Sequence, residues 1–189
     1  IINEIHNKKP EVIILTLASI ESNKAFLKQY HESQYSSDLK PTIVSLVLSD
    51  SDINYIPIEH CRGLYGIFSY FQNNDFSNNN DFLQSFKSKY GENERVGGYM
   101  ESAYVGVKLW AKAIQKCQSF EPNKITQAMR GLSYYGPGGI AYIDEENQHI
   151  WRHTHIAQVG SDGEFHVQWS SEQPIAPTPY PLSRPKNEW

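Results

Sequence analysis

Three histidines, His149, His153 and His155, lie close together towards the end of the chain. In an extended strand residues 153 and 155 point to the same face, so two imidazoles can converge on one metal ion. Zinc requires one or two further ligands, and no Cys, Asp or Glu joins these histidines at a recognised spacing. We therefore predict no metal site and interpret the histidines as polar residues on an exposed strand surface.

Motifs for nucleophilic or phosphate chemistry are missing from the sequence. It contains no G-x-S-x-G, no G-x-x-x-x-G-K-[ST] and no G-x-G-x-x-G after a strand. Asp50 and Asp52 are spaced like residues that begin a helix, which favours capping over an acid–base pair. We predict no catalytic residue, no cofactor and a protein that is not an enzyme. An enzyme stays open as the less favoured alternative, because distant residues can assemble a triad.

Composition narrows the class of protein further. The chain has 189 residues, of which 39% are hydrophobic and 20% charged, with a formal net charge of −4. These values are typical of a globular protein, and the lack of a Lys/Arg cluster argues against nucleic-acid binding. Cys61 and Cys117 are far apart in sequence, and we interpret them as unpaired thiols. The first residues, 1–5, resemble the middle of a helix, so we expect the natural start to lie upstream.

The first third of the chain alternates between predicted strands and helices. Glu11–Leu17 and Pro41–Leu48 are apolar, β-branched runs of the kind buried in parallel sheets. An apolar stripe around Phe26 indicates a helix between these runs, and Ser49 or Asp50 can cap a short helix that extends to residue 56. With a third strand over 63–70, the pattern predicts parallel strands joined by right-handed crossovers.

The middle of the chain is predicted to be helical. Asp81 can cap a helix that stops at Gly91, and a third helix is predicted from Pro122 to about Gly131. Between them the longest helix is predicted over 99–117. Its strongest signal is an apolar stripe at the helical period, which we expect to face the core: Met100, Ala103, Tyr104, Val107, Trp110, Ala111 and Ile114.

The last fifty residues contain the most distinctive pattern. Gly136-Pro-Gly-Gly139 precedes a predicted strand over 140–144, and Asn147-Gln-His149 forms a turn. Two further strands, over 156–160 and 165–169, flank a tight turn that contains Asp162-Gly163, because such turns favour Gly and Asp. A proline-rich tail follows Trp169.

These elements, in this order, resemble the C-terminal half of type I periplasmic binding proteins. The similarity is to the branch that binds branched-chain amino acids, urea and short-chain amides. It implies an α/β fold with a parallel sheet, flanking helices, and two lobes joined by a hinge, of which lobe one is incomplete. Residues 1–66 would form the strands and helices of lobe two, and 67–135 the hinge crossing and lobe-one helices. Residues 136–189 would form the return crossing, placed at Gly136–Gly139, then the C-terminal strands and tail.

Open α/β sheets bind ligands beyond the carboxyl ends of their strands. In this chain those positions include Ala18 and Ser19 after the first strand, and Ser45 and Val47 at the end of the second. The Ser19 hydroxyl either holds a carbonyl or amide group of the ligand or caps the following helix. Ser45 either reaches the ligand or bonds only to backbone. The apolar character of Leu46–Leu48 favours a ligand less polar than urea.

Tyr70, near the predicted hinge, and Tyr99 and Met100, at the start of the long helix, can close the pocket from other sides. The alternative is that these residues only pack in the hinge and in the core. Glu101 either faces the cleft or is a solvated glutamate stabilised by the helix dipole.

The resemblance implies a small-molecule receptor that acts by hinge closure as the solute-binding component of an ABC transporter. Its partner would be a membrane permease, and its location periplasmic or extracytoplasmic. The alternative is the ligand-sensing domain of a signalling regulator, either a kinase ectodomain or a cytoplasmic amide sensor. Exposed edges on an incomplete lobe also raise the hypothesis of a homodimer.

Overall fold

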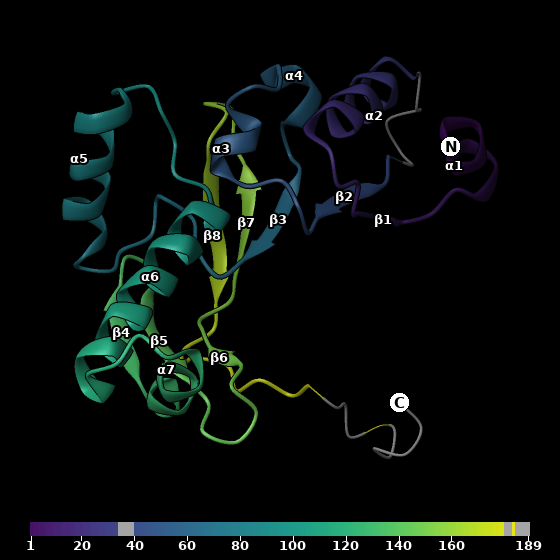
Figure 1. Cartoon of the computed structure of the whole chain (residues 1–189). Helices are drawn as coiled ribbons and strands as arrows, with labels where there is room; N and C mark the ends of the chain where they lie inside the picture. The colour runs from purple at the N-terminus through teal and green to yellow at the C-terminus, as the bar shows by residue number, and fades with distance from the viewer. Residues whose placement is uncertain (34–39, 180–182, 184–189) are drawn as a thin grey trace.

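The computed structural model describes residues 1–33, 40–179 and 183, and it contains two sheets. One has five strands in the order β1-β2-β3-β7-β8, and the other has three in the order β4-β5-β6. Each sheet carries its own helices (Figure 1). We call the two parts the five-stranded lobe and the three-stranded lobe.

The five-stranded sheet is parallel over its first three strands, as predicted. These are β1 (Val12–Leu15), β2 (Thr42–Ser45) and β3 (Tyr65–Phe68), and β7 (His155–Val159) and β8 (Phe165–Ser170) add antiparallel strands at one side. Leu15 pairs with Ser45, and Ser45 pairs with Gly66. The carboxyl ends of the three parallel strands therefore lie at one edge of the sheet.

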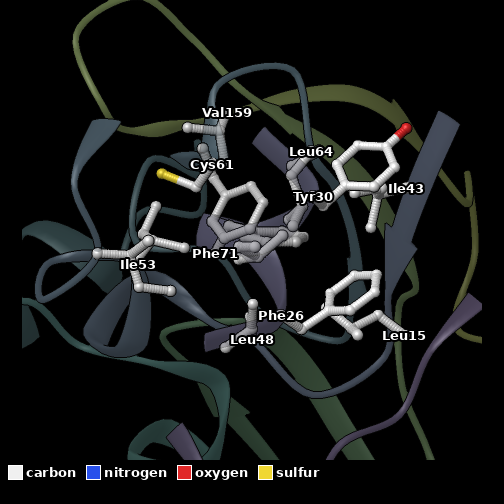
Figure 2. Packing of buried hydrophobic residues seen from close by; sticks show 14 residues of the cluster. Leu15, Phe26, Tyr30, Ile43, Leu48, Ile53, Cys61, Leu64, Phe71 and Val159 are labelled. Carbon is white, nitrogen blue, oxygen red and sulfur yellow. The ribbon is translucent and has the colours of Figure 1, made fainter. Parts of the chain in front are cut away.

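Four helices accompany this sheet: α1 (Ile2–Lys8), α2 (Ile20–Glu32), α3 (Asp50–Ile53) and α4 (Ile58–Cys61), of which α4 was not predicted. The apolar faces of α2 and the strands form the main core, because burial of such side chains is the dominant favourable contribution to folding. Figure 2 shows the packing of this core, which includes Leu15, Phe26, Tyr30, Ile43, Leu48, Ile53, Leu64, Phe71 and Val159.

The three-stranded lobe contains α5 (Asn79–Tyr90), α6 (Gly98–Cys117) and α7 (Pro122–Met129). Its strands are β4 (Ser133–Gly136), β5 (Gly139–Ile143) and β6 (Ile150–Trp151), and neither β4 nor β6 was predicted. Two small apolar clusters stabilise this lobe. Their buried members are Val105, Leu109, Ala141 and Ile143 in one cluster, and Ala113, Ile125 and Ala128 in the other.

The return crossing predicted at Gly136–Gly139 is wrong. Gly136 pairs with Gly139 across a hairpin turn, and Gly139 has φ +82, a conformation that glycine adopts without strain. The chain instead returns to the five-stranded sheet between β6 and β7, at residues 152–154. The proline-rich tail is described only to residue 179 and at residue 183, and the rest of it lies outside the described residues.

In the described part of the chain, three segments connect the lobes. The first passage is residues 69–78 after β3, the second is residues 152–154 before β7, and the third is residues 171–175 after β8. The second and third passages lie side by side, because Ser171 N–H donates to the Thr154 carbonyl at 2.9 Å. Ile175 N–H likewise donates to the Arg152 carbonyl at 2.8 Å.

The core face predicted for α6 is also wrong. Met100, Val107 and Trp110 are 44%, 64% and 46% exposed. The buried residues of this helix are Gly98, Glu101, Val105, Leu109 and Ala113, which lie on a different face. The helix is apolar on two sides, and α7 and the β4–β5 hairpin cover only one of them.

Cys61 and Cys117 are both free thiols, as predicted. Among the residues that the structure describes, none of the helices combines the length and the apolar character needed to cross a membrane.

Candidate ligand-binding site

The carboxyl edge of the parallel strands forms an open surface bounded by the first turns of α2 and α3. Helix N-termini present unpaired backbone N–H groups and a positive dipole end, which favour carbonyl or anionic groups of a ligand. The ladder between β1 and β2 continues one step further, because Leu46 N–H donates to the Leu15 carbonyl at 3.1 Å.

Ser19 lies at this edge, exposed beside the exposed Ala18. Its hydroxyl oxygen accepts a hydrogen bond from the Ser22 N–H at 3.1 Å and donates to the Ser22 hydroxyl at 2.9 Å. Ser19 is therefore the N-cap of α2, which is one of the two roles considered from the sequence.

Ser45 is fully buried at the end of β2. Its hydroxyl oxygen accepts hydrogen bonds from the N–H groups of Val47 at 3.2 Å and Leu48 at 2.9 Å. This bonding holds the turn that follows β2, with Leu46 on the exposed side and Val47 packed partly against the core. Ser45 thus bonds to backbone and shapes the turn that carries Leu46 and Val47.

Tyr70 and Met100 occupy different environments. Tyr70 is completely buried in the first passage, and its hydroxyl donates to Asn79 Oδ1 at 2.9 Å. Burial raises the pKa of Tyr70 far above its ordinary value. Met100 is partly exposed on the first turn of α6. The structure therefore does not bring these two residues together with Ser19 and Ser45 in one pocket.

The strand-end surface meets the three-stranded lobe at Phe68 and Tyr99. Phe68, the last residue of β3, packs edge-on against Tyr99 in the first turn of α6, with ring centroids 5.7 Å apart. A Cβ on the neighbouring Gly98 would lie 3.1 Å from the Phe68 ring, so glycine permits this approach. Strand and helix periodicity alone does not predict a contact between Phe68 and Tyr99.

A cavity of about 920 Å³ lies between α5, α6 and β4 in the three-stranded lobe. Of the predicted site residues only Met100 lines it. Aromatic and charged side chains share the lining, which comprises Asn78, Asp81, Phe82, Ser85, Phe86, Lys89, Tyr90, Glu94, Met100, Tyr104, Tyr134 and Pro137.

Asp50 is a buried carboxyl group beside the strand-end surface. Its Oδ2 accepts the Gln72 N–H at 3.3 Å, while its Oδ1 has no hydrogen-bond partner within the described residues. Burial raises the pKa of Asp50 to about 7, although the hydrogen bond from Gln72 opposes the rise. The capping role expected at this position belongs to Ser49 and Asp52, which form a capping box.

Glu101 is neither solvated nor directed at an open cleft, so both interpretations from the sequence were wrong. Its side chain is fully buried and forms an ion pair with Arg152 at 2.8 Å. The partner lies 51 residues further along the chain, which is why no local pattern indicates the pair.

His153 and His155 share a face, as predicted, with their rings stacked at a centroid distance of 6.2 Å. His155 is nevertheless buried, so the prediction of an exposed surface was wrong for it. Its Nδ1 bonds to the Ser170 hydroxyl at 2.7 Å, and burial lowers its pKa to about 4. In the described ranges, no group of three or more His, Cys, Asp or Glu side chains could hold a metal ion.

Comparisons with known proteins identify relatives of this fold. Residues 1–186 match the family described as the periplasmic binding protein domain. One similar solved structure is a solute-binding protein of an ABC transporter from Rhodopseudomonas palustris BisB5, in complex with 3,4-dihydroxybenzoic acid. It has a TM-score of 0.79 and 20% identity, over 93% of this chain and 49% of that one.

A second similar structure is the leucine-binding protein LivK of Thermotoga maritima MSB8, with a TM-score of 0.75 and 19% identity, over 89% of this chain and 47% of that one. A curated protein named limonene hydroxylase, from Geobacillus stearothermophilus, is 34% identical over 121 residues, which are 64% of this chain and 22% of that protein. This chain thus spans about half the length of the solved relatives and a smaller part of the curated one. The family match covers nearly the whole chain, and the chain belongs to the periplasmic binding protein family, with the α/β fold of its type I members.

Proposed function

We propose that this chain is part of a two-lobed receptor for a small molecule, the solute-binding component of an ABC transporter. Ligand would contact both lobes and stabilise their closed arrangement, which a membrane permease would then recognise. Such a receptor would act in the periplasm or another extracytoplasmic space. The family and the solute-binding relatives support this role.

The observation that carries the proposal is the contact between Phe68 and Tyr99. Phe68 ends a parallel strand at the edge where α/β sheets bind ligands, and Tyr99 belongs to the first turn of α6 in the other lobe. A molecule seated beside this contact touches both lobes at once. Closure driven by ligand requires such a shared surface, because only differential contacts shift a conformational equilibrium.

The side chains around this contact favour a ligand with an apolar body. Leu46, Val47 and Phe68 come from the strand ends, while Tyr99 comes from α6. A polar or anionic head group would bond to backbone amides at the start of α2, because the start of α3 is already occupied by the Ser49–Asp52 capping box. Among urea, short amides and amino-acid-like molecules, we therefore favour the last, and extend the class to aromatic carboxylic acids such as the ligand of the Rhodopseudomonas relative.

The uncovered face of α6 supports the proposal that the three-stranded lobe is completed by further polypeptide. Met100, Val107 and Trp110 are all exposed on this helix, and large exposed apolar patches in soluble proteins often mark a surface that another chain segment or partner covers. The solved relatives are about twice as long as the aligned region, so they contain chain that can serve this purpose. As part of the same proposal, residues 1–66 are assigned to lobe two and residues 67–135 to the hinge crossing and the helices of lobe one.

A sensing role is the second candidate. The match to the curated relative occupies only 22% of that protein, so a module of this kind also occurs within much longer polypeptides. In a regulator the same closure would be transmitted to a signalling domain in place of a permease.

A thermal-shift experiment on this chain, and on the longest natural polypeptide that contains it, tests the proposal. Leucine, 4-hydroxybenzoate, acetamide and urea serve as probes, because a ligand that binds only the native state raises its melting temperature. We expect leucine or 4-hydroxybenzoate to give the larger shift, and Tyr99→Ala to abolish it. Tyr55→Ala, an exposed tyrosine on the five-stranded lobe, is the control. The absence of a shift with every probe in both proteins would contradict the proposal.

A further inference from the structure

The ion pair between Glu101 and Arg152 is the most enclosed charged contact in the described structure. Arg152 Nη2 donates to both carboxylate oxygens of Glu101, each at 2.8 Å, and the Gly138 N–H donates to Oε1 at 3.2 Å. The side chains of Glu101 and Arg152 are 0% and 10% exposed. Burial raises the pKa of Glu101, and the Arg152 guanidinium opposes that rise.

All three passages between the lobes come together at this pair. Arg152 belongs to the second passage, and its carbonyl accepts the Ile175 N–H of the third. Gly138 links the pair to the first passage. A Cβ placed on Gly138 would lie 2.7 Å from Arg152 Nη2 and 3.3 Å from the Ser69 carbonyl oxygen, so the backbone fits closely between them.

Glu101, the acidic member of the pair, connects it to the start of α6. Glu101 lies in the first turn of that helix, directly after Tyr99 and Met100, and its N–H donates to the Gly97 carbonyl at 3.2 Å. Tyr99 in turn contacts Phe68 of the five-stranded lobe. The carboxylate therefore connects the passages to the helix turn that faces the strand ends.

We propose that Arg152 is a positioning residue that holds the first turn of α6 against the passages through Glu101, so that hinge movement and the placement of Tyr99 are coupled. The importance of Tyr99 for ligand rests on the proposed function, whereas the coupling itself does not.

The energetics of buried charges favour a positioning role over a purely stabilising one. An enclosed ion pair contributes little net stability compared with apolar residues of similar size, because both charges lose their hydration. Its geometry is directional, and here the Arg152 Nε is buried with no partner among the described residues, so the guanidinium is not optimally satisfied. A pair that gains little stability but fixes direction is suited to set the orientation of one element relative to another.

Hydrogen exchange of the full chain, measured without ligand, tests the coupling. In Arg152→Met and in Glu101→Gln we expect amides of residues 101–105 and 152–155 to exchange roughly 100-fold faster, because one buried charge loses its partner. Amides of β1 and β2 should change by less than about twofold. Glu121→Gln, which removes the exposed pair of Glu121 with Lys124 at 3.1 Å at the start of α7, should leave both regions unchanged.

The double variant Glu101→Met with Arg152→Met covers the case in which single variants do not fold. Apolar replacement removes the cost of an isolated charge, so we expect the double variant to fold and melt close to the wild type. The proposal predicts that residues 101–105 and 152–155 still exchange faster in it, because apolar contacts do not fix direction. Wild-type exchange in both segments, or an even acceleration throughout the chain, would overturn the coupling and leave the thermal-shift test of ligand binding unaffected.

Discussion

The carboxylate of Asp50 accepts a hydrogen bond from the backbone N–H of Gln72 at 3.3 Å, which joins α3 to the first passage. The side chain of Gln72 continues the connection, because its Oε1 accepts the Val96 N–H at 3.2 Å. One buried carboxyl group therefore helps to hold a helix, a passage and the segment before α6 in place. Its protonation state should affect all three.

The pH dependence of stability should reveal this group. The folded state raises the pKa of Asp50 from 3.8 to about 7, so it binds the proton more tightly than the unfolded state does. The resulting stability is fully present below about pH 4 and is lost as the pH rises through about 7. The free energy of unfolding of Asp50→Asn, relative to that of the wild type, should therefore increase by roughly 2–4 kcal/mol from pH 5 to pH 8. Urea unfolding at both pH values measures the difference, and a constant gap would contradict the assignment.

Gly97, the N-cap of α6, and Gly106, inside that helix, should respond oppositely to the same substitution. A Cβ on Gly97 would collide with the hydroxyl groups of Ser49 and Ser51, whereas a Cβ on Gly106 would meet nothing within 4 Å. Gly97→Ala should cost about 1–3 kcal/mol because α3 must move away. Gly106→Ala should stabilise by about 0.5–1 kcal/mol, because alanine favours a helix interior. Thermal unfolding of both variants provides the comparison, and equal effects would show that α3 and α6 do not pack as described.

Removing an aromatic ring from the main core should be far more damaging than removing one from the surface. Phe71 is fully buried in the first passage and packs on Phe165 with ring centroids 4.9 Å apart. Phe71→Ala should destabilise the chain by about 3–5 kcal/mol. Phe120→Ala is the matched control, since Phe120 is 79% exposed, and should change stability by less than about 0.5 kcal/mol. Denaturant midpoints at constant m-value distinguish the two outcomes.

The exposed apolar stripe of α6, which carries Met100, Val107 and Trp110, can be tested for a covering partner by introducing a charge. Val107→Lys should leave the stability of this chain within about 0.5 kcal/mol, whereas Leu109→Lys, on the buried face, should unfold it. In a longer natural polypeptide that covers the stripe, Val107→Lys should instead be strongly destabilising. If two copies of this chain cover the stripe as a homodimer, Val107→Lys should lower the mass measured by sedimentation equilibrium. No effect in either setting would show that the stripe has no partner.

Much of the fold could be predicted because local patterns determine it. The apolar runs before Leu15 and Ser45 gave two parallel strands, and Gly91 and Pro122 marked helix ends within a residue or two of their positions. Periodicity also showed that Met100 and Val107 share a face of α6. It could not show which face is covered, because that depends on α7 and the β4–β5 hairpin.

The candidate site was harder to predict because its polar groups bond either to backbone a few residues away or to side chains far away in sequence. Ser19 and Ser45 bond to backbone two or three residues away, an outcome that composition alone could not separate from ligand contact. Glu101 pairs with Arg152, 51 residues further along the chain, and Phe68 contacts Tyr99 only because the first passage turns the chain. Such contacts follow from the tertiary arrangement, which strand and helix patterns do not encode.

The third passage has a mechanical consequence. A single connecting segment would let two bodies swing and twist in every direction, but here residues 171–175 run beside residues 152–154 and are hydrogen-bonded to them. Linked segments of this kind resist torsion along their own length, while bending across them stays comparatively easy. We therefore expect the relative motion of the lobes to be restricted largely to bending about one axis. A partner that recognises closure would then respond to one angle between the lobes.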